Sequence, residues 1–280
     1  MLEHQVVGNA MQMVVCTLRP GQVLYAEAGK FLFRSGDVAM ETRFQQPLSQ
    51  KGQASKMKGL LAGALEAGKR MMAGESFAFQ QFQTSGGDGL VALAGVLPGE
   101  MRAIEVRPGD AWLAEKDAFV GAEGSVRFDV AFSGLSQGLA GGEGFVLEKF
   151  TSELGGTLFI GGAGNFIDIN PADYGGRLHV DTGCIVAFEG NKIRYGVEAV
   201  GGFNRKGLMS AMFGKEGLTV ATLEGDGRVI LQSMTIGALA TALSKNAAFG
   251  GRGEEGPTAG LGGLGMGTAG LGALFGGSRD

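Results

Sequence analysis

The sequence predicts a mainly β protein made of three internal repeats, and three observations support this prediction. The stretch from Pro20 to Phe44 recurs without a gap as Pro108 to Phe132, and a weaker copy lies at Val180 to Lys192. After each copy, an alternating apolar and polar strand runs through a Gly-rich turn, which is typical of a β-hairpin. The 280 residues include 53 glycines, far above the usual share of about 7%. A repeat of this kind predicts the architecture before any single residue predicts chemistry.

The first repeat, about residues 8–100, opens with short strands. The apolar run MQMVVCTL predicts a strand that ends at Arg19-Pro20-Gly21, because proline fixes φ and glycine tolerates positive φ in a turn. Further strands are expected over residues 23–28, 30–34 and 38–44. The hairpin that completes the repeat follows Gly74-Glu75.

A helical insert over residues 51–73 interrupts this repeat. Its apolar residues recur at helical spacing and form one face; they are Met57, Leu60, Leu61, Ala64, Leu65, Gly68, Met71 and Met72. The basic residues beside this face are Lys51, Lys56, Lys58, Lys69 and Arg70. Such a face suits an anionic membrane surface, a partner protein or a neighbouring subunit. The alternative is that the apolar stripe packs on the protein's own sheet.

The second and third repeats take up about residues 101–168 and 169–235. Residues 1–235 are therefore interpreted as one β domain of three small sandwich-like units. Each unit would be marginal alone, so we expect the three to pack around a shared axis with pseudo-three-fold symmetry. A short helix is expected over residues 236–249. The tail, residues 250–280, is Gly-rich and of low complexity, and we expect it to be disordered because it buries little side-chain area.

Composition narrows the class of protein. The net charge is −4, so no overall attraction to DNA, RNA or anionic lipid is expected. Cys16 and Cys184 fit no C-x-x-C pattern, which favours buried free thiols in a reducing cytoplasm. The N-terminal residues lack the basic region of a signal peptide, and no apolar run is long enough to predict a membrane-spanning helix.

Three acidic residues occupy matching positions in the repeats, namely Glu27, Glu115 and Asp181. A pseudo-three-fold axis would gather them, and they could then bind a hard cation or raise one another's pKa. The alternative is that each carboxylate accepts backbone N–H bonds in an equivalent turn. The same alternatives apply to a second set of acids, Glu75, Glu143 and Glu216.

The sequence contains no recognisable catalytic arrangement. Only His4 and His179 could serve as a histidine base, and His179 alternates out of phase with its apolar neighbours, as a solvent-facing residue does. No glycine run has the spacing of a phosphate-binding loop between a strand and a helix. We therefore expect no enzymatic activity and no cofactor or metal.

Five ordered segments resemble a known family. They are PGQVLYAEAGKFLF, GLLAGALEAGKRMMAGESFAF, WLAEKDAFVGAEG, GGEGFVLEKF and VDTGCIVAFEGNKIRYGV. Together, over about residues 5–235, they are similar to the family named for altered inheritance of mitochondria, whose bacterial members are described as tryptophan-RNA-binding-attenuator-like proteins of unknown function. The resemblance implies three repeats related to the double-stranded β-helix, often self-associating. It carries over no catalytic residue.

The sequence thus favours a non-enzymatic, self-assembling β scaffold that acts through protein or membrane-surface contacts. We expect a homo-oligomer, with a trimer as one candidate, because open strand edges tend to pair. The alternative, by analogy with the attenuator fold, is a ring protein that binds a small ligand or RNA. RNA binding has little support from the residues, since no strand interleaves basic and aromatic side chains.

Overall fold

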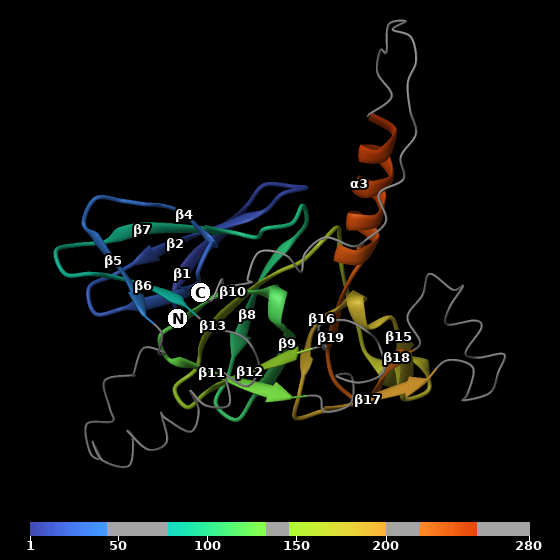
Figure 1. The fold of residues 1–280 in the computed structure, drawn as a ribbon. Coiled ribbons are helices and arrows are strands. Elements are labelled where there is room, and N and C mark those ends of the chain that lie inside the picture. Colours follow the sequence, from blue (N-terminus) through green and yellow to red (C-terminus); the bar gives the residue numbers. More distant parts are fainter. Residues whose placement is uncertain (44–77, 133–145, 200–218, 251–280) are drawn as a thin grey trace, which may run out of the picture. The chain divides into compact units, whose positions relative to one another are not determined.

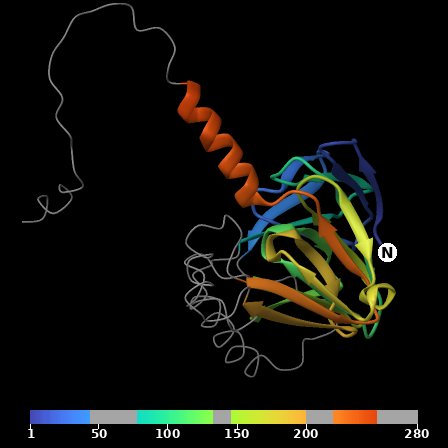
Figure 2. The same ribbon diagram turned by 90° about the vertical axis from the view of Figure 1, so that its right-hand side faces the viewer.

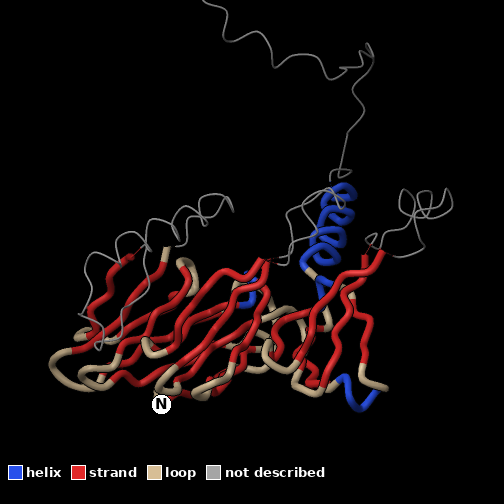
Figure 3. Tube along the Cα trace, turned by 90° about the horizontal axis from the view of Figure 1, so that it is seen from below, coloured by secondary structure: helices blue, strands red, loops and turns tan. Residues whose placement is uncertain are grey.

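The protein is described here from a computed structural model that covers residues 1–43, 78–132, 146–199 and 219–250. The chain forms two compact units, residues 1–239 and 240–280. Figure 3 shows that strands, drawn in red, make up most of the described part of the first unit. The prediction of a mainly β protein is confirmed.

The described strands of the first unit form four sheets, and Figure 1 labels most of these strands. The first sheet has the order β1 (Glu3–Val7), β2 (Met13–Leu18), β7 (Gly89–Ala94) and β4 (Phe31–Arg34). The second has the order β5 (Val38–Arg43), β6 (Phe79–Thr84), β3 (Val23–Glu27), β10 (Phe119–Glu123), β13 (Gly156–Gly161) and β8 (Met101–Val106). The third has the order β11 (Val126–Phe132), β12 (Val146–Ser152), β9 (Ala111–Glu115), β16 (Ile185–Glu189), β19 (Val229–Gln232) and β14 (Phe166–Ile169). The fourth has the order β15 (Arg177–Val180), β18 (Thr219–Gly225) and β17 (Ile193–Ala199).

Few described residues are helical. Three short 3₁₀ helices cover Lys116–Ala118, Pro171–Tyr174 and Thr182–Cys184. The helix α3 (Ile236–Gly250) follows β19 in the chain (Figure 2) and confirms the short helix expected near residues 236–249. No helix in the described ranges has the length and apolar character needed to cross a membrane.

The buried apolar side chains of the described ranges form three cores, each between two successive sheets. The first core contains Leu18 and Leu93 from the first sheet and Leu24 and Phe82 from the second. The middle core joins the second and third sheets through an aromatic group, which consists of Tyr25, Phe79, Trp112, Phe119, Phe128 and Phe150. The last core lies between the third and fourth sheets and contains Phe188, Ile193 and Leu223. Because successive side chains of a strand point to opposite faces, the middle sheets must be apolar on both.

This layering explains the two kinds of strand pattern. In β2, buried and half-buried residues alternate, because only one face of the first sheet is covered by another sheet. In β10, the four residues Phe119 to Ala122 are all buried, because the second sheet has a neighbour on each side.

The second and third sheets are joined at their centres in the same way. In the second sheet β3 pairs with β10, and Ala26 lies opposite Gly121. In the third sheet β9 pairs with β16, and Ala114 lies opposite Ala187. We call each of these two strand pairs a joint. Each brings together strands that are far apart in sequence.

Some predictions fall outside the described residues. They are the helical insert 51–73, the basic residues Lys51, Lys56, Lys58, Lys69 and Arg70, the acids Glu75, Glu143 and Glu216, and the tail beyond Gly250.

Candidate functional site

Two of the three acids singled out in the sequence accept backbone hydrogen bonds. Glu115 ends β9, and its carboxylate accepts a 2.8 Å hydrogen bond from the N–H of Asp117. Asp181 follows β15, and its carboxylate accepts a 2.8 Å bond from the N–H of Gly183. Each carboxylate caps the short 3₁₀ helix that follows its strand. Both acids are therefore used to end a strand and begin a turn.

Glu27, the third acid, lies beside a buried lysine. The ammonium of Lys30 is 3.3 Å from the Glu27 carboxylate and donates a 3.4 Å hydrogen bond to the backbone carbonyl of Asp117. Only 4% of Lys30 is exposed. A buried ammonium is costly unless it is paired, so these contacts hold the turn after β3 against the turn after β9.

The structure brings Glu27 and Glu115 within electrostatic reach of each other. Burial raises the pKa of Glu115 to about 7; the charges of Asp117 and, more weakly, Glu27 add to the rise, and the Asp117 N–H bond opposes it. Asp181 instead acts on Cys184, whose thiol pKa is raised first by burial and then by Asp181. Within the described ranges, no three His, Cys, Asp or Glu side chains are grouped to hold a metal ion.

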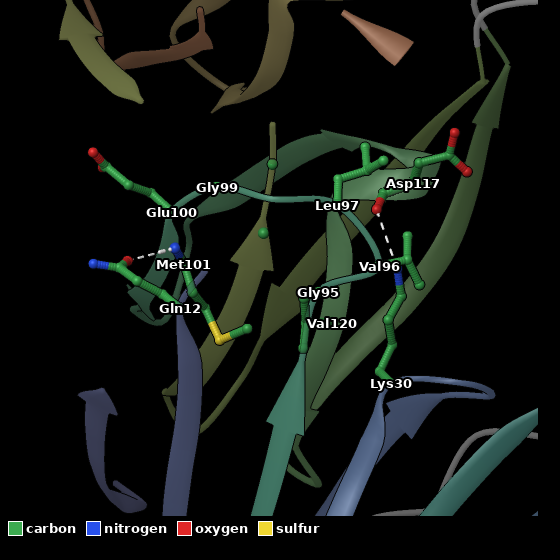
Figure 4. Close-up of a pocket in the computed structure, with 12 residues that line it drawn as sticks. Gln12, Lys30, Gly95, Val96, Leu97, Gly99, Glu100, Met101, Asp117 and Val120 are labelled. Atoms are coloured by element: carbon green, nitrogen blue, oxygen red, sulfur yellow. Dashed lines mark hydrogen bonds between the residues drawn. The ribbon is translucent and has the colours of Figure 1, made fainter. Parts of the chain in front are cut away.

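Lys30 and Asp117 also line a small hollow, which Figure 4 shows. On its other side the side-chain oxygen of Gln12 accepts a 2.8 Å hydrogen bond from the N–H of Met101. The hollow has a cavity volume of about 10 Å³, roughly the space that one water molecule requires. Sites for cofactors and small ligands usually enclose about 300–1,000 Å³. This hollow is therefore too small for either.

The outer face of the first sheet is apolar over β2, β7 and β4, whereas Glu3 and Gln5 of β1 lie on the same face opposite Thr17 and Val15. Phe33 and Val15 both lie opposite Ala92 in neighbouring strands, so the three side chains share one face. Leu90 lies on this face as well, opposite Thr17. Phe33 and Leu90 are exposed. We call this surface the apolar face of the first sheet.

The outer face of the fourth sheet is charged instead. Arg177 forms ion pairs with Glu198 at 3.4 Å and with Glu224. Arg194 also pairs with Glu224, and His179 lies 3.7 Å from Glu198. The two outer sheets of the unit thus present different chemistry to solvent.

Several of these features are missed by motif reasoning. Lys30 carries no motif, and its burial depends on a contact with Asp117 across the fold. Leu32 and Phe33 look like ordinary strand residues, since nothing in their local sequence distinguishes a covered sheet face from an open one. The position that matches Leu32 in the second copy is Val120, and comparing the exposure of the two requires the structure.

Comparison with known proteins agrees with the sequence resemblance. The sequence profile of the family described as mitochondrial biogenesis AIM24 matches residues 4–234. The chain belongs to the AIM24 family. The match covers most of the chain and nearly all of the described strands of the first unit.

Two relatives of this AIM24 family chain come from Streptococcus pyogenes. An uncharacterized protein of serotype M6 is 28% identical over 242 residues, which cover 85% of this chain and 89% of the relative. The X-ray crystal structure of a Streptococcus pyogenes protein superposes with a TM-score of 0.63 at 23% identity, and the match covers 88% of this chain and 100% of that chain. At this identity the likeness to the crystal structure shows the fold alone. The family is one of unknown function, so the comparisons assign no activity.

Proposed function

We propose that this AIM24 family protein is a non-enzymatic, self-assembling β scaffold that acts through protein or membrane-surface contacts. One observation carries the proposal, the apolar face of the first sheet beside the edge of β4 that no described strand covers. Exposed apolar patches and open strand edges are both features that proteins cover by association. The hollow beside Lys30, in contrast, offers no support for the alternative of a ligand-binding ring.

Self-association is tested directly by sedimentation velocity of the full chain across the micromolar range. The expected result is a mass that grows with concentration beyond one copy. A single species of monomer mass at every concentration would overturn the proposal.

We further infer that the β domain consists of three units, over about residues 8–100, 101–168 and 169–235. One support is a bulge that recurs in the strand pairing, after Phe31, after Phe119 and after Ile185. A second is a recurring backbone contact: Leu90 N–H donates to the Ser35 hydroxyl at 2.9 Å, Thr157 N–H to the Glu123 carboxylate at 3.2 Å, and Arg228 N–H to the Glu189 carboxylate at 2.7 Å. The two joints connect the units in a row, and no pairing among the described strands supports a shared three-fold axis.

The basic residues of the insert supply the membrane part of the proposal. Changing Lys51, Lys56, Lys58, Lys69 and Arg70 to Gln should abolish salt-sensitive binding to vesicles that contain anionic lipid, because each cation near such a surface contributes about 1 kcal/mol. Co-sedimentation of the full chain and this variant, with anionic and with neutral vesicles, measures the effect. If both proteins sedimented equally with the vesicles, or if neither did, the proposed membrane contact of the insert would be refuted and only protein contacts would remain in the proposal.

A further inference from the structure

The two joints show which strand pairings are absent at the edges of the first and fourth sheets. In each joint the strand before a capping acid, β3 or β9, pairs with the bulged strand of the next unit, β10 or β16. One strand that precedes a capping acid, β15, and one bulged strand, β4, have no such partner among the described strands. Among the described strands, β15 pairs only with β18, and β4 pairs only with β7. Figure 1 shows these two strands at opposite ends of the unit.

The leftover strands expose residues that the joints bury. Leu32 of β4 is 51% exposed, whereas Val120, which follows the matching phenylalanine of β10, is fully buried. Val120 belongs to the first core, where it faces the preceding sheet. The apolar face of the first sheet therefore corresponds to a surface that is covered in the interior of the stack.

The third sheet also exposes an apolar residue, on the face that would meet the first sheet of another copy. Ile167 of β14 lies opposite Leu231, as Val14 of β2 lies opposite Leu93. Val14 is fully buried under the second sheet, whereas Ile167 is 57% exposed. The second sheet has six strands and extends over Val14. The fourth sheet has only three strands and leaves Ile167 exposed.

A glycine supplies an independent observation. In the joints, Gly124 N–H donates to the Val23 carbonyl at 2.7 Å and Gly190 N–H donates to the Ala111 carbonyl at 2.6 Å. A Cβ at Gly124 would lie 2.9 Å from the Val23 side chain, and one at Gly190 would lie 2.7 Å from Leu113. Both positions therefore require glycine because the paired strand passes close to them.

Gly36 holds the matching position after β4, yet a Cβ there would meet nothing within 4 Å. Its φ is not in the left-handed region, so its backbone conformation gives no reason for glycine either. No contact with a described residue accounts for this glycine. A strand laid against β4, as in the two joints, would account for it.

We propose that copies of this chain join head to tail, with β4 of one copy added to the free edge of β15 of another. This proposal rests on the self-association proposed above and specifies its contact. The register of the joints places Phe33 opposite Val180 and Arg34 opposite His179, with Gly36 N–H donating to the Arg177 carbonyl. The apolar face of the first sheet then covers Ile167 and Leu231 of the other copy. One copy contributes β4 and the apolar face of the first sheet, and the other contributes β15 and the third sheet. Because these surfaces differ, the contact is heterologous and extends to a closed ring or a filament.

The contact between copies differs from the joints in one respect. The joints pair small residues, Ala26 with Gly121 and Ala114 with Ala187, whereas the ends present Phe33 and Val180. Because strand spacing is set by backbone hydrogen bonds and not by side-chain size, these larger side chains would fill space on the faces of the joined sheet without separating the strands. The charged outer face of the fourth sheet makes a face-to-face pairing of two fourth sheets unfavourable, because its ion pairs would lose water.

Two variants of the full chain test the proposal, one on each surface. Gly36→Val introduces a side chain whose Cβ meets none of the described residues within 4 Å but would collide with β15 of another copy. Ile167→Glu places a charge on the complementary surface. Each should weaken self-association at least about tenfold in sedimentation velocity, while the melting temperature of the dilute protein stays unchanged. The matched controls are Gly86→Val, at another glycine with open space around it, and Leu154→Glu, at a leucine that is 69% exposed.

A mixture of the two variants separates head-to-tail from face-to-face contact. Each variant keeps the surface that the other has lost, so an equimolar mixture should form a heterodimer and nothing larger. If the first sheets of two copies met face to face, Ile167→Glu would assemble like the wild type and the mixture would gain no species, which overturns the proposal. Assembly of the wild type with neither variant impaired would refute this contact and leave self-association standing. A wild type that stays monomeric would refute both.

Discussion

At the level of single residues, the ionisable groups near the β3–β10 joint serve the fold. Lys30 is buried with a carboxylate and a backbone carbonyl as partners. Glu115 caps a turn, and its burial among other acids raises its pKa to about 7. A perturbed carboxyl group in a cleft is often a sign of catalysis. Here the adjoining hollow is too small for a substrate, and the perturbation follows from packing two turns together.

The raised pKa of Glu115 predicts how stability depends on pH. The folded protein holds a proton on Glu115 that the unfolded chain has lost between pH 4.5 and about 7, so the contribution of this residue to the free energy of unfolding falls as pH rises through that window. Glu115→Gln should remove this part of the slope and leave the protein more stable than the wild type at pH 8. Urea unfolding at a series of pH values measures the slope.

The control is Glu153→Gln, at a side chain that is 78% exposed in the turn between β12 and β13. It should leave the slope as in the wild type. Identical slopes for wild type and Glu115→Gln would show that Glu115 ionises alike in the folded and unfolded states.

At the level of elements, the bulged strands β10 and β16 connect the two halves of the second and third sheets. β10 pairs with β13 on one side and with β3 on the other, and β16 pairs with β19 and with β9. Their small residues at the pairing positions, Gly121 and Ala187, allow β3 and β9 to approach.

Asp168 adds a contact between the second and third sheets. Burial alone would raise the pKa of its carboxyl group, but hydrogen bonds from Arg228 and Arg102 outweigh burial and lower the pKa.

The close approach at β10 makes Gly121 sensitive to substitution. A Cβ there would lie 2.7 Å from the Leu93 side chain and 2.9 Å from the backbone oxygen of Tyr25. Gly121→Ala should therefore cost about 1–3 kcal/mol of stability, as overpacking of a core usually does. Gly86→Ala, where the new Cβ meets nothing within 4 Å, should be nearly neutral in the same urea titration. Equal stability of the two variants would mean that the joint is looser than described.

At the level of the whole unit, four sheets and three cores form a stack whose outer sheets differ. The first sheet is apolar outside over β2, β7 and β4 and the fourth is charged outside, so the two ends of the stack are not interchangeable. Among the described strands, the first sheet ends at β4 and the fourth at β15, the two kinds of strand that pair in the joints. These complementary edges are the reason for expecting head-to-tail assembly, which can grow or close into a ring.

Assembly predicts that thermal stability depends on protein concentration. Only the folded chain can form the contact, so the melting temperature of the wild type should rise with concentration. Phe33→Glu places a charge on the apolar face of the first sheet and should make the melting temperature independent of concentration. Calorimetry or circular dichroism over the micromolar range measures both. A wild-type melting temperature that does not change with concentration would contradict assembly.

Local pattern was sufficient for a large part of this fold. Alternation and Gly-rich turns predicted strands, and the apolar run after Met234 predicted the short helix. The match of Pro20 to Phe44 with Pro108 to Phe132 placed Glu27 and Glu115 at the ends of equivalent strands. The predictions of strands and of the short helix succeeded because side-chain period and turn chemistry depend on neighbours in the sequence.

The joints, and with them the candidate surfaces, could not be read from the chain. The pairing of β3 with β10 depends on strands about a hundred residues apart in sequence, and no local signal selects that partner over another strand of similar pattern. Whether Leu32 is covered, or Lys30 meets Asp117, depends on which sheets lie beside it. The sequence specifies each strand and which of its faces are apolar, whereas packing alone determines which of those faces stay open.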